Sequence, residues 1–448
     1  MRRSQVVFVA VLTALLILPA VAEAKVRTQV LRSGPYQLGG YRTEFIKKSV
    51  ERPRLSGYVT KMHASLVDGR GRRVNIDSGM LHHVFFNNLD VPRVKGNCNS
   101  QPPEVFYGTG EENQSLDLPA GYGYRLRKSD DWEMSGMLMS HRYSEKPVYI
   151  RYEVTVDTAK RTPVRPLWVR ANGCGSSSSY HVRGGGSPGT MDDRVFNWKV
   201  PITGRIVAAG GHLHGGSKNL QMRQPACGNR VLYDNKPFYA PADDLLYTIA
   251  PRLHEAGPVQ TSWFKSRTGI PVTKGETLNL HGLYDAEHAR ASVMSITHVY
   301  VAPTKKAPPA GCSPLPKDAK QSGPKPGLRA SAPYQPIPLY KFNRRHWPVE
   351  LAEPEGRTRR LPDNGTISLR AFQFSPAKVE IKAGSTIRWR FGDVAEHNIT
   401  FASGPRAGAG QTGHKGQTTT TQFTTPGRYQ FFCSLHPMTM RQQITVTP

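Results

Sequence analysis

Four residues near the C-terminus have the types and spacing of a redox-active metal site. Cys433, His436 and Met440 fall within eight positions, and His397 precedes them in GDVAEHNIT. One thiolate, two imidazoles and a weak thioether suit copper that cycles between two oxidation states, since soft sulfur favours Cu(I) and imidazole tolerates Cu(II). Three ligands on one short loop and a fourth on a distant strand let a rigid scaffold fix the geometry. Little then has to move when an electron is transferred.

The sequence leaves the axial ligand of this site open. The loop reads HPMTM, so Met438 competes with Met440 for that position. A structural interpretation is the alternative to a metal site. In that case Cys433 is a thiol of the core, and the histidines are surface residues. His414, in QTGHKGQ, is typical of a solvated loop residue.

Residues 25–303 carry a second set of metal-ligand types. His82 and His83 are adjacent in MLHH, and GGHLHGG holds His212 and His214. Residues two apart share one face of a strand, so His212 and His214 can point at one ion. Adjacent residues point to opposite faces, so His82 and His83 can share a metal only with a bulge or by using different ring nitrogens.

Two single residues complete these candidates. His141 lies in MLMSHRYS and Met294 in ASVMSITHV. A hydrogen-bonded structural histidine and a core methionine are their alternatives. Four further histidines could replace His141 or Met294 as a ligand: His63, His281, His288 and His298. His298 shares a strand face with Met294.

The N-terminus predicts export. Two arginines precede an apolar run that ends in the small-residue pattern AEA, which is typical of a cleavable signal peptide over 1–24. An uncleaved anchor is the rival interpretation, but Pro19 interrupts the run, which is short for a bilayer of roughly 30 Å. No later segment is apolar enough to cross a membrane, so we expect a secreted, periplasmic or cell-envelope protein.

The cysteine count agrees with this compartment. Four of the five cysteines can form two disulfides where conditions are oxidising: Cys98, Cys174, Cys227 and Cys312. Cys433 is left over. An exposed thiol there would be prone to oxidation unless something holds it, and a metal is the simplest holder.

The chain is strongly basic, with a net charge of +27, or +26 once the two arginines and one glutamate of 1–24 are removed. Such a surplus favours contact with an anionic envelope surface or an acidic partner. Nucleic acid is the other candidate partner, but the predicted export and the absence of a basic helix or an aromatic-basic RNA motif count against it, so we expect no nucleic-acid partner.

The elements that must position these residues are short strands. Runs such as VYIRYEVTV and ETLNLHGLY alternate or are rich in β-branched and aromatic residues, and long helical periodicity is missing. We therefore predict an all-β protein built of antiparallel sandwiches. A Pro/Lys/Arg-rich stretch over 304–361 predicts a stiff, extended linker, and a weaker Gly/Ser-rich break begins at Asn172. The predicted units are a signal peptide, two sandwiches, the linker and a small C-terminal sandwich: 1–24, 25–165, 166–303, 304–361 and 362–448.

The C-terminal segment resembles the cupredoxins of the plastocyanin, pseudoazurin and amicyanin kind. The motifs are EHNITF, PGRYQFFC and CSLHP. The resemblance implies a blue, type 1 copper that transfers electrons, held by His397, Cys433, His436 and Met440. Gln442 departs from the pattern, because it stands where a glycine often follows the axial methionine.

Residues 55–303 resemble the ascorbate-dependent type II copper monooxygenases, peptidylglycine α-hydroxylating monooxygenase and dopamine β-monooxygenase. MLHH, LMSHRYSEKPVYIRYEVTV, GGHLHGG and PVTKGETLNLHGLYD carry the likeness. It implies two jelly-roll-like sandwiches with one type 2 copper each. His82, His83 and His141 would hold the copper that feeds in an electron. His212, His214 and Met294 would hold the catalytic copper that binds dioxygen. The resemblance also favours a Cys174–Cys312 disulfide, which leaves Cys98 with Cys227.

These features favour a secreted copper oxidoreductase whose tethered cupredoxin supplies electrons to a monooxygenase-like dicopper core. It would need a redox partner or a small-molecule reductant. A flexible tether would raise the local concentration of donor near acceptor. One alternative is a non-enzymatic envelope protein that binds copper or carries electrons with an incomplete N-terminal site. A carbohydrate- or partner-binding sandwich is the other, but it leaves MLHH and HLHGG unexplained.

Overall fold

The computed structural model describes residues 25–96, 103–175, 177–306, 312–351, 353–406 and 412–448. In these residues helix is limited to a 3-10 turn, Pro225–Cys227, and one short α-helix, α1 (Leu245–Thr248). The prediction of an all-β protein is confirmed. No helix in the described ranges is both long enough and apolar enough to cross a membrane. The predicted signal peptide and Cys98 lie outside the described residues.

One eleven-stranded sheet runs through both N-terminal sandwiches. Its main order is β1 (Val26–Leu38), β9 (Lys146–Asp157), β3 (Gly57–Asp68), β7 (Tyr122–Leu126), β10 (Thr162–Arg170), β20 (Arg290–Pro303), β13 (Gly204–Leu213), β18 (Phe264–Val272) and β21 (Lys320–Gln321). Two short strands pair beside it: β6 (Leu116–Asp117) and β11 (Ser179–Val182). β10 joins the halves, because it pairs parallel with β7 and antiparallel with β20. The predicted boundary at 165 therefore falls inside a strand of a continuous sheet.

A second sheet covers each half of this large sheet. The first is β2 (Thr43–Val50), β8 (Trp132–Ser140), β4 (Gly79–Asn88) and β5 (Glu104–Gly110). The second is β12 (Met191–Lys199), β19 (Thr277–Asp285), β14 (Ser217–Gln224) and β15 (Arg230–Asp234). A two-stranded piece lies nearby, β16 (Pro237–Phe238) with β17 (Gln260–Thr261).

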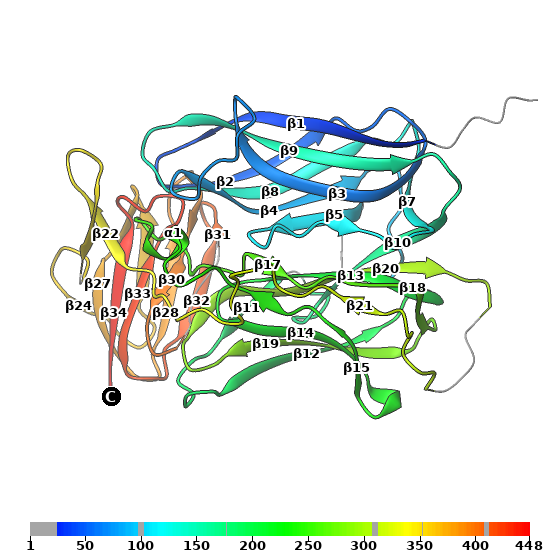
Figure 1. The fold of residues 1–448 in the computed structure, drawn as a ribbon. Helices are drawn as coiled ribbons and strands as arrows, with labels where there is room; N and C mark the ends of the chain where they lie inside the picture. The colour runs from blue at the N-terminus through cyan, green and yellow to red at the C-terminus, as the bar shows by residue number, and fades with distance from the viewer. Residues whose placement is uncertain (1–24, 97–102, 176, 307–311, 352, 407–411) are drawn as a thin grey trace, which may run out of the picture.

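Strand alternation builds a separate core in each sandwich. Along β9 every second residue is buried, from Val148 to Val156, so one face packs inward and the other meets solvent. Tyr152 packs in the first core with Phe86 of the facing sheet. Leu220 and Val299 meet in the second core. The two sandwiches lie one above the other in Figure 1.

The C-terminal sandwich has its own two sheets. One is β24 (Arg359–Arg360), β27 (Lys378–Lys382), β34 (Arg441–Thr447), β33 (Gly427–Phe432) and β30 (Thr400–Ser403). The other is β26 (Gln373–Ser375), β25 (Thr366–Arg370), β28 (Thr386–Phe391) and β32 (Thr418–Gln422). A small pair, β29 (His397–Asn398) and β31 (Thr412–Gly413), lies at one end. Trp389 and Phe431 fill the core.

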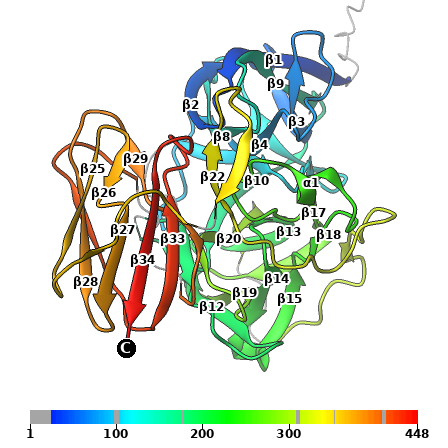
Figure 2. The same cartoon turned by 90° about the vertical axis from the view of Figure 1, so that its left-hand side faces the viewer.

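The C-terminal sandwich is docked against the two others (Figures 1 and 2). One apolar cluster joins all parts of the molecule. Met80 and Met139 come from the first sandwich, Leu253 from the second, and Phe432 from the third. Leu339, in the segment predicted as a linker, is buried in the same cluster.

That segment is held along the molecule and does not behave as a free tether. It forms a hairpin, β22 (Leu339–Phe342) with β23 (Pro348–Leu351). Phe342 stacks on Tyr41 at 4.8 Å between ring centroids, and the His346 ring stacks on Tyr143 at 3.6 Å. The proline-rich composition predicts an extended chain, but it does not predict that Phe342 and His346 stack on aromatic rings of the first sandwich.

The predicted Cys174–Cys312 disulfide is wrong. Cys312 pairs with Cys227, and their Cα atoms lie 5.4 Å apart. Next to this disulfide, the Arg230 guanidinium donates to the carbonyl of Ser313 at 2.7 Å. Cys174 is itself disulfide-bonded, and Cys433 is a buried free thiol.

Candidate copper centres

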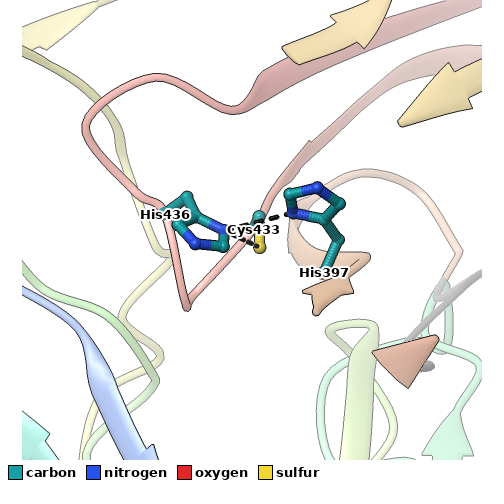
Figure 3. Close-up of side chains that lie close together, drawn as sticks. All are labelled: His397, Cys433 and His436. Carbon is teal, nitrogen blue, oxygen red and sulfur yellow. Dashed lines mark hydrogen bonds between the residues drawn. The ribbon is translucent and has the colours of Figure 1, made fainter. Parts of the chain in front are cut away.

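The C-terminal sandwich brings His397, Cys433 and His436 together (Figure 3). His397 lies on β29, and the other two lie on the loop after β33. Cys433 Sγ lies 3.6 Å from Nδ1 of His436, and the two Nδ1 atoms of the histidines lie 3.1 Å apart. The ligand atoms of all three lie within 4.8 Å of one another. Two imidazole nitrogens that face each other beside a thiol form a donor set that fits copper.

Neighbouring groups orient these ligands. His397 Nε2–H donates to Asp393 Oδ1 at 2.7 Å, which leaves Nδ1 with its lone pair toward the thiol. The backbone N–H of Asn398 donates to Cys433 Sγ at 3.3 Å, and its side-chain amide donates to the Ser434 hydroxyl at 2.8 Å. The strand and the loop are thereby fixed to each other.

Burial affects the protonation of Cys433 and His436 in the metal-free site. It raises the pKa of the Cys433 thiol to about 11. Burial, together with the neighbouring His397, lowers the pKa of His436 to about 4. At neutral pH the thiol is therefore protonated and His436 is uncharged, so a metal that binds must displace the thiol proton.

The methionines of the loop differ in burial. Met440 is fully buried, whereas Met438 is half-buried. The N–H of Cys433 donates to the carbonyl of Met440 at 3.1 Å, so this methionine starts the returning strand beside the thiol. Burial favours Met440 as the axial residue. Outside the ligands, the Phe372 ring lies 4.7 Å from that of His436 and is 45% exposed.

The N-terminal sandwiches gather the other predicted histidines into one cluster. The His82 ring is its centre, because it meets the rings of His83 at 5.1 Å and His214 at 5.3 Å. The His212 ring lies 5.1 Å from that of His214 and 6.2 Å from that of His83. The adjacent pair and the HxH pair, which lie on different sandwiches, therefore share one place.

A bulge brings the adjacent pair to the same side. The register of β4 against β8 shifts between Leu81 and His83, so the strict alternation of the strand is broken at His82. The Nδ1 atoms of His82 and His83 lie 2.9 Å apart. This is the condition under which the sequence allowed the pair to share a site.

The two histidines of the HxH pair each have a ring nitrogen free to bind a metal. Nε2 of both His212 and His214 is buried without a hydrogen-bond partner among the described residues. His212 Nδ1–H donates to Glu112 at 3.1 Å, which directs its Nε2 away from the carboxylate. Burial lowers the pKa of His83 to about 3 and that of His214 well below its usual range, so these rings are neutral and can offer lone pairs. Two buried, unpartnered imidazole nitrogens fit a bound metal.

Met294 lies beside this pair. Leu213 pairs with Ser295 on β20, so the register places Met294 opposite His214. The Tyr284 hydroxyl donates to the carbonyl of Met294 at 2.6 Å and accepts from the N–H of His214 at 2.9 Å.

His141 lies farther from the cluster. Its Nδ1–H donates to the carbonyl of Ile76 at 2.8 Å. Its ring is 6.5 Å from that of His254, a residue that the sequence did not single out. The spare histidines have other neighbours: His63 bonds Ser115, His281 bonds Asp193, His288 stacks on Tyr334, and His298 packs on Trp168.

A cavity of about 410 Å³ connects these centres. The N-terminal sandwiches line it with six residues that could act as metal ligands: His82, His83, Glu111, His214, His254 and Met294. The C-terminal sandwich contributes Asn398 and Ser434, which flank His397 and Cys433. Tyr334 and Ile337 of the segment before the hairpin form another part of its wall.

Comparison with known proteins agrees with the C-terminal geometry. The family of copper-binding proteins of the plastocyanin/azurin type matches residues 364–447. Amicyanin-alpha from Methylorubrum extorquens is 31% identical over 83 residues, which cover 18% of this chain and 69% of that protein. Amicyanin from Paracoccus versutus is 32% identical over 87 residues, 19% of this chain and 65% of that protein.

Through this domain, the chain belongs to the plastocyanin/azurin family. Its C-terminal sandwich is a cupredoxin domain that binds copper, as the motifs predicted.

The N-terminal half has a different relative. A protein from a Phoma species described as a probable copper-dependent oxygenase M1 is 24% identical over 232 residues, 48% of this chain. The chain spans 56% of that protein's length. The predicted resemblance to copper oxygenases is confirmed.

Proposed function

We propose that this protein is an exported copper oxidoreductase in which a type 1 copper passes electrons to copper held by the N-terminal histidines. His397, Cys433 and His436 hold the type 1 copper, with Met440 as the axial ligand. The observation that carries the proposal is the shared cavity, since the histidine cluster and the residues that flank Cys433 line the same space.

The cupredoxin domain offers a short route from its metal to this cavity. Cys433 Sγ accepts the N–H of Asn398, and Cys433 is bonded covalently to Ser434. Both Asn398 and Ser434 reach the cavity wall. A path of one hydrogen bond or one covalent bond therefore joins the Cys433 thiol to the wall of the space that the histidine cluster also lines.

The copper ligands that we propose for the N-terminal core are those implied by its resemblance to the copper monooxygenases. His82 and His83, with His141, receive the electron, and His212, His214 and Met294 form the catalytic site. Bound copper would supply one-electron chemistry with dioxygen. The chain's own residues orient and shield it: Glu112 holds His212, and Tyr284 ties His214 to Met294. A small-molecule reductant or a redox partner supplies the electrons. The positive net charge favours contact of the protein with an anionic envelope surface.

The proposal is tested by metal analysis of the copper-loaded chain. We expect about three coppers per chain, an intense visible band that disappears in Cys433→Ser, and type 2 signals in electron paramagnetic resonance. Ascorbate-driven oxygen consumption should fall at least about tenfold in His212→Ala while the visible band stays. His414→Ala, on an exposed loop, is the matched control. Unchanged oxygen consumption in His212→Ala would contradict catalysis at this site.

A non-enzymatic electron carrier is the second candidate, and one observation favours it. Among the described residues, the cupredoxin triad and an acidic turn are the sets whose ligand atoms all lie within 4.8 Å of one another. The N-terminal cluster is more open. One copper per chain and no oxygen consumption would support this candidate.

A further inference from the structure

We propose that the copper at the paired-histidine end of the core is held by His82, His254 and Glu111, with the Met80 thioether beside them. This inference rests on the proposed function, and it replaces His83 and His141, which the resemblance implies as ligands of one of its copper sites. It assigns ligand roles to residues that the MLHH motif alone does not indicate, and it draws them from both sandwiches.

The position of Glu111 defines the site. Its Oε1 lies 3.7 Å from His82 Nε2 and 3.7 Å from His254 Nε2. His254 Nε2 lies 3.0 Å from Sδ of Met80. Ligand atoms bound to one tetrahedral ion at about 2.0 to 2.3 Å lie roughly 3.3 to 3.8 Å apart, so Glu111 Oε1 lies at a metal-site spacing from each imidazole nitrogen. Within the described ranges, His82, His254 and Glu111 are not a set whose ligand atoms all lie within 4.8 Å of one another, so a bound ion would have to draw the two imidazoles together.

The hydrogen bonds of His254 and Glu111 direct their free atoms into this space. His254 Nδ1–H donates to the carbonyl of Glu255 at 2.7 Å, so its Nε2 carries a lone pair. The N–H of Gly257 donates to Glu111 Oε2 at 3.0 Å, which leaves Oε1 toward the imidazoles. Each ligand is thus oriented by its backbone surroundings.

The charge balance also calls for a cation. The Glu111 side chain is only 11% exposed, and its ion-pair partners among the described residues are the two histidines. A carboxylate taken out of water needs a compensating positive charge, which a metal ion at this place would supply. Two imidazoles, a carboxylate and a thioether suit copper in either oxidation state.

His141 does not compete for this place. Its ring lies 6.5 Å from the His254 ring, and its Nδ1 is bonded to Ile76. His254 therefore lies between His141 and His82, whose ring is 5.3 Å away. The third ligand of this copper comes from the loop after α1, on the second sandwich.

The test is a copper titration of the full-length variants, followed by metal analysis and electron paramagnetic resonance. His254→Ala should lower bound copper from about three to about two per chain and remove one type 2 signal, while the Cys433 visible band stays. Glu111→Gln should weaken the same site at least about tenfold. His281→Ala, a buried histidine outside the cavity, should keep three coppers.

The outcomes separate this inference from the proposed function. Three coppers and unchanged type 2 signals in His254→Ala would overturn the inference alone, as would loss of that copper in His141→Ala only. A wild-type chain that binds one copper would overturn both. X-ray absorption adds a check that does not depend on affinity, because Met80→Leu should remove a sulfur contribution from the Cu(I) protein and keep the copper count.

Discussion

Glu112 shows how a single residue can support a metal ligand without touching the metal. Its carboxylate is almost fully buried and accepts the Nδ1–H of His212. Burial lowers the pKa of His212, but the charge and hydrogen bond of Glu112 outweigh this, so the pKa lies above its usual value. Copper at Nε2 would take over the role of the proton that this carboxylate favours.

We predict that Glu112→Leu lowers the affinity of the core for copper by about 10- to 100-fold, because His212 loses its fixed tautomer and orientation. Glu112→Gln, whose amide oxygen can still accept the hydrogen bond, should lose less. Competition with a chelator, read by the type 2 signal, measures the change. Glu350→Gln, on the exposed β23, serves as control, and equal affinity in Glu112→Leu and wild type would refute the positioning role.

At the scale of elements, strand patterns in the sequence predicted the architecture and the common face of the HxH pair. Alternation along runs such as β9 predicted the sandwiches, and the HxH spacing on β13 predicted a shared face. The bulge at His82 could be stated only as a condition, because register depends on the partner strand. No sequence motif indicates His254. It lies in a loop after α1, and the position of that loop depends on tertiary contacts.

The start of the linker is an element whose stability should depend on pH. Burial alone would raise the pKa of Asp318, but hydrogen bonds from the Ser266 hydroxyl and the amides of Thr268 and Arg267 lower it to about 2. A carboxyl whose folded pKa lies below its unfolded value of 3.8 stabilises the fold above about pH 4. This contribution is lost as the pH falls toward 2.

We therefore predict that Asp318→Asn lowers the free energy of unfolding of the metal-free protein by about 1 kcal/mol at pH 6, discounted for solvent screening. Near pH 2 the difference from wild type should vanish. Thermal unfolding of both proteins at the two pH values measures it, with Lys317→Ala as the neighbouring control. A difference that persists at pH 2 would show that the carboxylate charge is not the cause.

At the scale of the whole molecule, three domains are assembled around one cavity. The cluster of Met80, Met139, Leu253, Leu339 and Phe432 takes residues from every part. The composition of the linker predicted extended chain but not the partners of its aromatic residues, because stacking on Tyr41 and Tyr143 depends on where the first sandwich lies. The disulfide was mispredicted for the same reason, since the sequence does not show that Cys312 lies beside the 3-10 turn that carries Cys227.

We predict that the double variant Tyr41→Ala, Tyr143→Ala releases the β22–β23 hairpin. Two aromatic pairs contribute about 1 to 3 kcal/mol together, so the opened population should rise roughly 10- to 100-fold. Limited trypsin digestion with mass spectrometry should then show faster cleavage at Lys341, Arg344 and Arg345. Tyr149→Ala, on β9, is the control. Equal cleavage rates would mean that the hairpin is held by other contacts.

Tyr334 and Ile337 of the predicted linker form part of the wall of the cavity of about 410 Å³. Neither residue is one of the proposed copper ligands. Under the proposed function, substitutions at these two positions would alter the shape of the space and leave every proposed ligand in place. Recognition of a small molecule and redox chemistry would then depend on separate stretches of the chain, and each could diverge while the other is kept.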